Sequence, residues 1–319
     1  MARPPAALAA TIAALPDEPG VYRFRDARGT VLYIGRAVRL RRRVRSYWGD
    51  LRDRRRLLPM VARVAEIEAV ICASEHEAAW LERNLLAEHK PRANRAVGGA
   101  ESEVYLRLTK GGLQLVHDPP AEFGPFLGGE QTRLAVAGIH RAVPLPYAQP
   151  RTGSERAMAQ ARGATDGDAM LALVTAALSG EAAAVAAIAA TLEQARDEQA
   201  AGLRFERAGQ LQAQLSAFRW VVAEQRVTGV TPDRFDAVGW CRGVEVLFRF
   251  RDGRLREWLR HSRDELSSRP LVEATPAPWR DFARRSAELA ADLIAASRAA
   301  RDESPALALS ATGRPGTST

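Results

Sequence analysis

Two tyrosines, a run of arginines and one misplaced glutamate are the residues of this chain best suited to chemistry. Tyr22 and Tyr33 fall in two short runs of aromatic and β-branched residues, GVYRFRD and GTVLYIG. Six arginines then follow within residues 36–45. Guanidinium groups bind phosphate in a bidentate way, and a tyrosine hydroxyl can donate or accept a proton. The question is whether one of these arginines has a role that the others lack.

The overall charge makes an anionic polymer the first partner to consider. The formal net charge is +8 and the sequence pI is about 10.2. Of the 46 basic residues, only Lys90 and Lys110 are lysines, a bias expected from a GC-rich genome. Composition therefore accounts for the number of arginines, and only their positions can distinguish them.

Helical geometry separates the arginines. If the arginine-rich segment is a helix, Leu40, Val44 and Tyr47 form its buried stripe. Arg43 and Arg39 flank this stripe on the Tyr47 side. The other arginines of the helix lie on other faces: Arg41, Arg42 and Arg45. We expect Arg43 and Arg39 to turn toward whatever Tyr47 contacts.

Glu82 lies inside the apolar arc of a second predicted helix. This helix begins with a capping box, Ser74 and Glu77, and ends before Pro91. A buried, unpaired carboxylate is costly, so Glu82 should meet a cation. That cation is either an arginine, in a purely structural pair, or a metal ion.

These side chains belong to a predicted α+β unit with a small antiparallel sheet flanked by helices. The two tyrosine-containing strands form a hairpin with a four-residue loop at residues 26–29, which pairs Tyr22 with Tyr33. Residues 68–73 are the third strand, and helices are expected at residues 38–48 and 57–65. A helical hairpin region and a short β/α carboxy-terminal segment follow. The expected divisions are residues 14–97 for this α+β unit, 98–147 for a β-rich extension, 148–168 for a flexible linker, 169–228 for helices folded back near Gly202, 229–303 for a β segment plus helix, and 304–319 for a disordered tail.

Membrane and disulfide-rich classes are excluded by the sequence. No apolar run approaches the length of a membrane span, and the amino terminus does not resemble a signal peptide, so we expect a cytoplasmic protein. Cys72 and Cys241 give neither a disulfide framework nor a metal-binding spacing.

Together the spaced residues resemble a known family. GVY at 20–22, YIG at 33–35, Arg43, Glu82 and Asn94 look like the GIY-YIG endonuclease domain, in the form found in UvrC, the incising subunit of bacterial nucleotide excision repair. The stretch ARDEQAAGLRFERAGQLQAQL resembles the UVR motif, through which UvrC docks on UvrB. The resemblance covers about residues 14–260.

The chain also departs from the UvrC pattern. The interval between the nuclease domain and the UVR-like motif has no cysteine, so we expect no iron–sulfur cluster. The sequence ends where UvrC continues into a second nuclease domain, an arrangement similar to shorter UvrC homologues, of the Cho kind, that make one cut. Gln210 and Gln212 dilute the UVR match, and Arg36 stands where the family usually has lysine.

The resemblance implies a role for each motif residue. Glu82 would hold one divalent ion, Mg or Mn, and Arg43 would contact the scissile phosphate. Tyr22, supported by Tyr33, would take a proton from the attacking water, with Arg36 supplying the cation that favours a phenolate. The further expected DNA contacts are Arg39, Arg42, Tyr47, Arg52, Arg54 and Arg55, with Asn94 supporting the site.

The resulting hypothesis is a metal-dependent DNA endonuclease that makes a single incision in DNA repair. Its expected partners are DNA and, through residues 191–226, UvrB, with no membrane. Two alternatives remain open. One is a catalytically silent adaptor that binds DNA or UvrB, and the other is a structural interaction protein whose basic face reflects codon bias.

Overall fold

The computed structural model divides the chain into two compact units. Residues 1–97 and 230–319 form the first unit, and residues 98–229 form the second. The structure describes residues 3–49, 52–94, 103–109, 111–118, 121–148, 152–161, 163, 166–224 and 234–303, without the side chains of 52–54. The expected tail, 304–319, lies outside the described residues.

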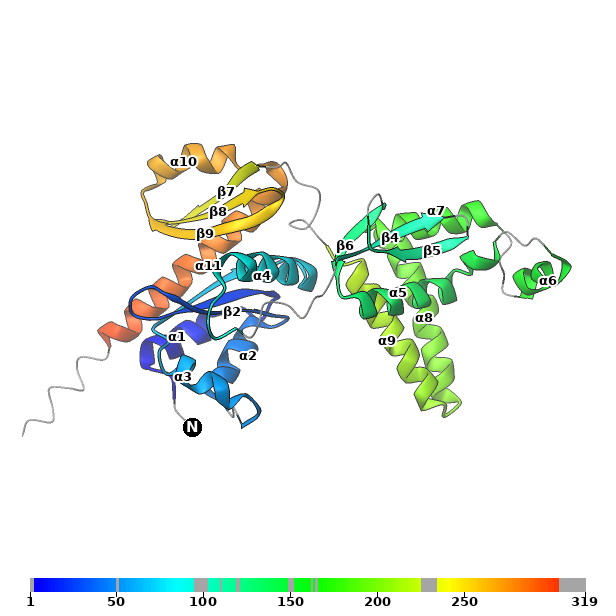
Figure 1. The fold of residues 1–319 in the computed structure, drawn as a ribbon, viewed down its shortest axis with the longest axis horizontal. Helices are drawn as coiled ribbons and strands as arrows, with labels where there is room; N and C mark the ends of the chain where they lie inside the picture. Colours follow the sequence, from blue (N-terminus) through cyan, green and yellow to red (C-terminus); the bar gives the residue numbers. More distant parts are fainter. Residues whose placement is uncertain are drawn as a thin grey trace, which may run out of the picture. The chain divides into compact units, whose positions relative to one another are not determined.

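The first unit is built on a three-stranded antiparallel sheet (Figure 1). Its strands are β1 (Gly20–Arg25), β2 (Val31–Ala37) and β3 (Glu66–Ile71), in the order β2-β1-β3. The surrounding elements are α1 (Ala6–Ala14), α2 (Leu40–Arg45), the 3₁₀ turns Ser46–Trp48 and Arg52–Leu57, α3 (Leu58–Val61) and α4 (Glu75–His89). The predicted class, α+β with a small antiparallel sheet flanked by helices, is confirmed.

The hairpin register differs from the expected one. Tyr22 pairs with Gly35, and Tyr33 pairs with Phe24. The loop has three residues rather than four, because the Asp26 N–H donates to the Thr30 carbonyl oxygen. Gly29, the last loop residue, adopts a left-handed φ of 79°. A second irregularity follows between Phe24 and Arg25. The resulting shift of two residues keeps Tyr22 and Tyr33 on one face, because side chains alternate with a period of two.

The arginine-rich helix is shorter than predicted, but its buried stripe is confirmed. Leu40, Val44 and Tyr47 are all buried. Helix α2 starts only at Leu40, because the backbone N–H groups of Leu40 and Arg41 donate to the carbonyl oxygens of Glu18 and Pro16. The loop before β1 therefore satisfies two of the donors that a helix start leaves open.

The carboxy-terminal segment is part of this first unit and not a separate domain. Its elements are β7 (Arg234–Cys241), β8 (Val244–Arg251), β9 (Arg254–Ser262), α10 (Glu265–Ala274) and α11 (Ala277–Asp302). The strands form a second antiparallel sheet, and the long helix α11 runs past both sheets (Figure 1). Leu289 and Leu293 of α11 are buried in the same apolar core as Tyr22 and Tyr47. Segments more than 240 residues apart in sequence thus share one core.

The second unit joins two segments that the sequence divided. It contains β4 (Glu103–Thr109), β5 (Gly112–Val116), β6 (Phe123–Leu127), α5 (Gly129–Ala142), a 3₁₀ turn (Leu145–Tyr147), α6 (Gly153–Ala161), α7 (Gly167–Leu178), α8 (Ala182–Ala201) and α9 (Phe205–Val221). Phe126 of the sheet and Phe218 of α9 are buried in one core. Helices α8 and α9 fold back at Gly202, as predicted.

The expectation of a flexible linker at residues 148–168 is wrong in its central part, which forms α6. Thr152 and Glu155 make a capping box: the Glu155 N–H donates to Thr152 Oγ1, and the Thr152 N–H donates to a Glu155 carboxylate oxygen. Asp166 then caps α7 by accepting the Ala169 N–H. The Gly and Ala content suggested a linker, and these short capping signals outweigh it.

Within the described residues, no single helix is long and apolar enough to cross a membrane; α7 and α8 meet that criterion only when taken together across a bend of 105°.

Candidate active site

Three tyrosines gather on one face of the first sheet. The hydroxyl oxygens of Tyr22 and Tyr47 lie 2.7 Å apart and share a hydrogen bond, and both side chains are almost fully buried. Tyr33 stacks beside Tyr22 with ring centroids 6.3 Å apart. Phe24 meets the Tyr47 ring edge-on at 5.1 Å. Residues from β1, β2 and the turn after α2 therefore place three hydroxyl groups in one aromatic cluster.

Arg43 joins this cluster, as the helical geometry predicts. Its Nε donates to the Tyr22 hydroxyl at 3.4 Å, and its guanidinium carbon lies 5.5 Å from the centre of the Tyr47 ring. Arg39, which was expected on the same side, instead faces Asp17 at 3.9 Å and is largely exposed. The residue at 39 precedes the first turn of α2, so the angle assigned to it on a longer helix does not apply.

The glycines of the two motifs are explained by close approach. A Cβ atom at Gly35 would lie 2.5 Å from the Tyr22 hydroxyl oxygen and 2.9 Å from the Tyr33 ring. A Cβ atom at Gly20 would lie 2.2 Å from the Val70 carbonyl oxygen and 2.7 Å from a Leu40 methyl group. Glycine at 35 makes room for the tyrosine pair, and glycine at 20 lets α2 and β3 approach β1.

The tyrosine hydroxyls are held in their protonated form. Burial, followed by the neighbouring Tyr33, raises the pKa of Tyr22 to about 12, although the hydrogen bond to Tyr47 and the charge of Arg43 oppose this shift. Burial also raises the pKa of Tyr33 and of Tyr47. Burial would lower the pKa of Arg43, but its contacts with Tyr22 outweigh this effect and raise it. The cluster therefore contains neutral phenols beside a permanent cation.

Glu82 meets a cation, as its position in the apolar arc of α4 requires. Its Oε2 lies 3.5 Å from Arg36 Nε, and its side chain is 20% exposed. Arg36 is therefore a cation that pairs with Glu82. Arg43, not Arg36, is the cation that contacts Tyr22, which corrects the expectation that Arg36 supplies it.

Asn94 fixes the edge strand that carries Tyr33. Its side-chain amide donates to the Ile34 carbonyl at 2.7 Å, and its Oδ1 accepts the Ile34 N–H at 3.1 Å. An asparagine side chain thus pairs with the open edge of β2 as a neighbouring strand would. Both bonds go to the backbone of Ile34, so Asn94 supports the position of the strand that carries Tyr33.

The other predicted DNA-contacting residues differ in accessibility. Arg42 and Arg55 are exposed, whereas Tyr47 is buried in the aromatic cluster, where its hydroxyl shares a hydrogen bond with Tyr22. The side chains of Arg52 and Arg54 lie outside the described residues. Among the described residues, no group of three or more His, Cys, Asp or Glu side chains is arranged to hold a metal ion, which leaves Glu82 as a single carboxylate.

Sequence reasoning missed a buried ion pair behind the sheet. Arg23 and Glu68 form a hydrogen-bonded pair and are both almost fully buried, and Trp258 of β9 covers the Arg23 guanidinium at 4.0 Å. Arg25 and Arg260 also contact Glu68, at 2.6 and 3.6 Å. The signal in the sequence is an arginine between Tyr22 and Phe24 whose side chain must point away from the tyrosines. This network joins the first sheet to the carboxy-terminal strands.

Comparison with known proteins matches the first part of the chain to a family. Residues 18–95 match the family described as the UvrC-like GIY-YIG domain. Residues 18–95 form a UvrC-like GIY-YIG domain. Relatives of the chain include the UvrABC system protein C of Desulforudis audaxviator, which is 33% identical over 78% of this chain and 44% of the relative. The corresponding protein of Symbiobacterium thermophilum is 31% identical over 82% of this chain and 46% of the relative.

This UvrC-like chain spans less than half the length of those relatives. Among solved structures, the GIY-YIG amino-terminal endonuclease domain of UvrC from Thermotoga maritima, described as bound to its catalytic divalent cation, magnesium, is 35% identical. The match covers 27% of this chain and 92% of that domain, with a TM-score of 0.25.

Proposed function

We propose that this UvrC-like protein is a metal-dependent DNA endonuclease that makes a single phosphodiester incision in DNA repair. The observation that carries the proposal is the meeting of Arg43 with the Tyr22–Tyr47 hydroxyl pair on one face of the sheet. A fixed guanidinium beside a hydroxyl at hydrogen-bond distance can hold a phosphate next to a group that handles a proton. The match of residues 18–95 to the UvrC-like GIY-YIG domain supports the same conclusion.

Glu82 and its surroundings fit a single divalent ion. Mg²⁺ commonly binds through one or two carboxylates and completes its shell with water and substrate phosphate oxygens. Glu82 is one carboxylate, partly exposed, on the rigid helix α4. It would hold the ion, which when bound would supply positive charge against the negative charge of the transition state.

The chain's own residues divide the remaining work. Arg43 would bind the scissile phosphate, since a guanidinium donates two parallel hydrogen bonds to it. Tyr22 is a neutral phenol because its pKa is raised to about 12. Only its small phenolate fraction can serve as the base, and that form would accept the proton of the attacking water as the new bond forms. The hydrogen bond with Tyr47 would hold the Tyr22 oxygen in place.

A nicking assay tests this function. Lesion-bearing duplex DNA is incubated with the protein and Mg²⁺ or Mn²⁺, with and without UvrB. We expect nicking by the parent protein and none by Glu82→Ala, while Arg43→Ala reduces the rate by at least about 100-fold. Glu88→Ala is the matched control, because Glu88 lies on the same helix, is exposed and pairs with Arg256. Nicking that survives Glu82→Ala would rule out the proposed site.

We further propose that the α8–α9 hairpin, within residues 191–226, is where UvrB docks. The hairpin tip exposes Leu203 and Phe205, at 75% and 67%, and such neighbouring apolar side chains suit a protein contact. Binding of purified UvrB should weaken at least about tenfold in Leu203→Ser/Phe205→Ser. Leu266→Ser, at an equally exposed leucine of α10, should leave it unchanged. A protein that binds UvrB and DNA but never nicks would instead be an adaptor.

A further inference from the structure

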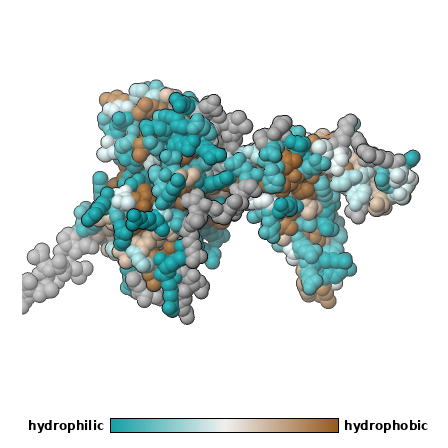
Figure 2. Space-filling model, in the orientation of Figure 1, coloured by the Kyte–Doolittle hydropathy of each residue, from teal (hydrophilic) through white to brown (hydrophobic). Residues whose placement is uncertain are grey.

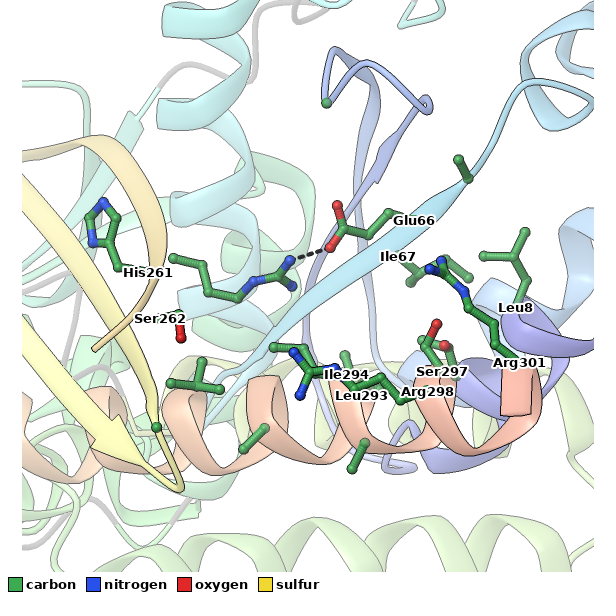
Figure 3. Close-up of a pocket in the computed structure, with 18 of the residues that line it drawn as sticks. Leu8, Glu66, Ile67, His261, Ser262, Leu293, Ile294, Ser297, Arg298 and Arg301 are labelled. Atoms are coloured by element: carbon green, nitrogen blue, oxygen red, sulfur yellow. Dashed lines mark hydrogen bonds and ion pairs between the residues drawn. The ribbon is translucent and has the colours of Figure 1, made fainter. Parts of the chain in front are cut away.

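A cleft of about 790 Å³ lies between the two sheets of the first unit (Figure 3), and none of the three clustered tyrosines lines it. Its walls come from α1, the β1–β2 loop, the start of β3, the β7–β8 turn, the end of β9 and the carboxy-terminal half of α11. This volume falls in the range of ordinary ligand sites, roughly 300–1,000 Å³. Nothing proposed above for the incision uses this cleft.

The lining of the cleft is apolar inside and basic at its edge. The aliphatic residues that line it are Leu8, Ile67, Val244, Leu293 and Ile294. Four arginines line it as well, from three different elements: Arg242, Arg260, Arg298 and Arg301. The lining contains two acidic residues, Asp26 and Glu66, so the cleft carries an excess of positive charge. Such a lining suits a ligand with both an anionic group and an apolar surface.

Two of these arginines are available to a ligand. Arg260 is paired with Glu66, and Arg242 is paired with Asp292. Within the described residues, no ion pair joins Arg298 or Arg301, and both side chains are exposed. Figure 3 shows Arg301 reaching from α11 toward Ile67, and Arg298 lying beside Ile294.

The position of the two arginines near the end of α11 does not by itself explain them. Cations near a helix carboxy terminus are favoured by the helix dipole. However, Arg298 and Arg301 are three residues apart and so lie on one face, where like charges repel each other. A bound anion would attract both guanidinium groups and so offset their mutual repulsion. The aliphatic residues beside the pair would bury an apolar part of the same ligand.

We propose that this cleft binds a short stretch of single-stranded DNA, with phosphates on Arg298 and Arg301 and base faces on the aliphatic floor. The β1–β2 hairpin links this cleft to the proposed incision site, because its strands carry Tyr22 and Tyr33 while Asp26, Ala27 and Gly29 at its turn line the cleft. The proposal rests on DNA being the substrate. It adds a second contact that would hold a strand separated near the incision.

The shape and lining favour a single strand over other anions. A duplex presents phosphates outside and keeps its bases stacked, so it offers nothing apolar to the floor, whereas a single strand offers both. An acidic peptide would satisfy the arginines through carboxylates. Guanidinium pairs bind phosphate at least as well as they bind carboxylate, and the arginines of α2 lie in the same unit. The floor consists of aliphatic side chains, which contact the face of any base in the same way, so we expect little preference for one base over another.

The test is DNA binding by the full chain in a Glu82→Ala background, which prevents cutting. Fluorescence anisotropy with a 12-nucleotide single strand compares two cleft variants with two controls. Arg298→Glu/Arg301→Glu reverses the cleft charge, and Ala295→Trp fills the cleft without changing charge, since Ala295 is exposed and lines it. Arg207→Glu/Arg269→Glu makes the same charge change at exposed arginines outside the cleft, and Ala299→Trp adds the same bulk to α11 outside it.

We expect the charge reversal to weaken single-strand binding at least about tenfold. The slope of log binding constant against log salt concentration should become shallower by about 1 to 2. Filling the cleft should weaken binding about threefold or more, while each control changes it less than about twofold. Equal losses in cleft variants and controls would overturn the proposal, as would equal losses for a duplex of the same sequence. Preferential binding of a poly-glutamate peptide would also overturn it. Because no cutting is needed, the result stands apart from the nicking assay.

Discussion

The hydroxyl oxygens of Tyr22 and Tyr47 lie 2.7 Å apart inside a cluster that Arg43 borders. Tyr22 comes from the central strand and Tyr47 from the turn that ends the arginine-rich helix, so the pair ties that helix to the sheet. Because this bond is buried, each tyrosine holds its proton more tightly than in water. The consequence is a measurable dependence of the reaction on pH.

Nicking should accelerate as the pH rises. With the pKa of Tyr22 raised to about 12, only a small phenolate fraction exists at pH 7, and it grows about tenfold per pH unit up to that pKa. The initial rate measured from pH 7 to 9.5 should rise accordingly. Tyr22→Phe should flatten the profile and lower the rate by about 10²- to 10⁴-fold. Tyr105→Phe, the same change in the other unit, is the control. If Tyr22→Phe keeps the slope, another group takes the proton.

Arg36→Lys should be tolerated, and Arg36→Ala should not. The cation beside Glu82 can be an ammonium as well as a guanidinium, so we expect Arg36→Lys to keep the nicking rate within about fivefold. Arg36→Ala should lower the rate by at least about tenfold. It should also raise the apparent affinity for Mn²⁺, because a positive charge next to the carboxylate is removed. A metal titration of nicking measures both effects, and an unchanged metal affinity in Arg36→Ala would contradict the assignment.

Gly35→Ala should lower the nicking rate. The added Cβ would lie 2.5 Å from the Tyr22 hydroxyl oxygen, so the ring must move and its contacts with Tyr47 and Arg43 must change. A displacement of about 1 Å at a reacting group can cost about 100-fold in rate, and we expect a loss of that order. Gly209→Ala, where a Cβ meets no atom within 4 Å, is the matched control and should nick normally. Full activity of Gly35→Ala would mean that Tyr22 need not keep its place.

Local patterns predicted the parts of the site that are built locally. The buried stripe of α2, the side on which Arg43 lies and the cap at Ser74 each depend on residues within a few turns, so periodicity was enough to find them. The face shared by Tyr22 and Tyr33 was predicted although the register was not. That register depends on a loop geometry set by Gly29, which a count of loop residues does not reveal.

Contacts between distant segments could not be predicted in the same way. Nothing in the local sequence of Arg36 distinguishes Glu82 from Tyr22 as its partner. The packing of Leu289 and Leu293 under the tyrosine cluster depends on how α11 passes both sheets. An amphipathic helix shows that it buries one face, but not what covers that face. The same limit hid the buried pair of Arg23 and Glu68, whose cover, Trp258, comes from β9.

Removing one partner of that buried pair should be costly. Burial alone would raise the pKa of Glu68, but the charge and hydrogen bond of Arg23 hold it below its usual value, so the pair is ionised at neutral pH. Glu68→Ala leaves the Arg23 charge buried, and the free energy of unfolding should fall by about 3–5 kcal/mol. Arg23→Met/Glu68→Met should recover most of this loss. Urea unfolding at pH 7 measures both, and a double variant less stable than Glu68→Ala would contradict the argument.

The carboxy-terminal helix should influence incision through Arg285, which pairs with Glu18 in the loop before β1. The Glu18 carbonyl accepts the Leu40 N–H, so this loop holds the start of the helix that carries Arg43. Glu18→Arg and Arg285→Glu should each lower the nicking rate by roughly fivefold, about 1 kcal/mol, by placing like charges together.

The charge-exchanged double variant, Glu18→Arg/Arg285→Glu, should restore most of the rate, because the pair is re-formed with its signs reversed. Binding of uncut duplex should stay constant throughout, since neither residue is expected to touch DNA. Arg284→Glu breaks an ion pair with Glu288 within α11 alone, and it should not change nicking. If the double variant is as slow as the single ones, the pair is not what connects α11 to Arg43. A loss in Arg284→Glu of the same size would indicate a general effect of charge on this helix.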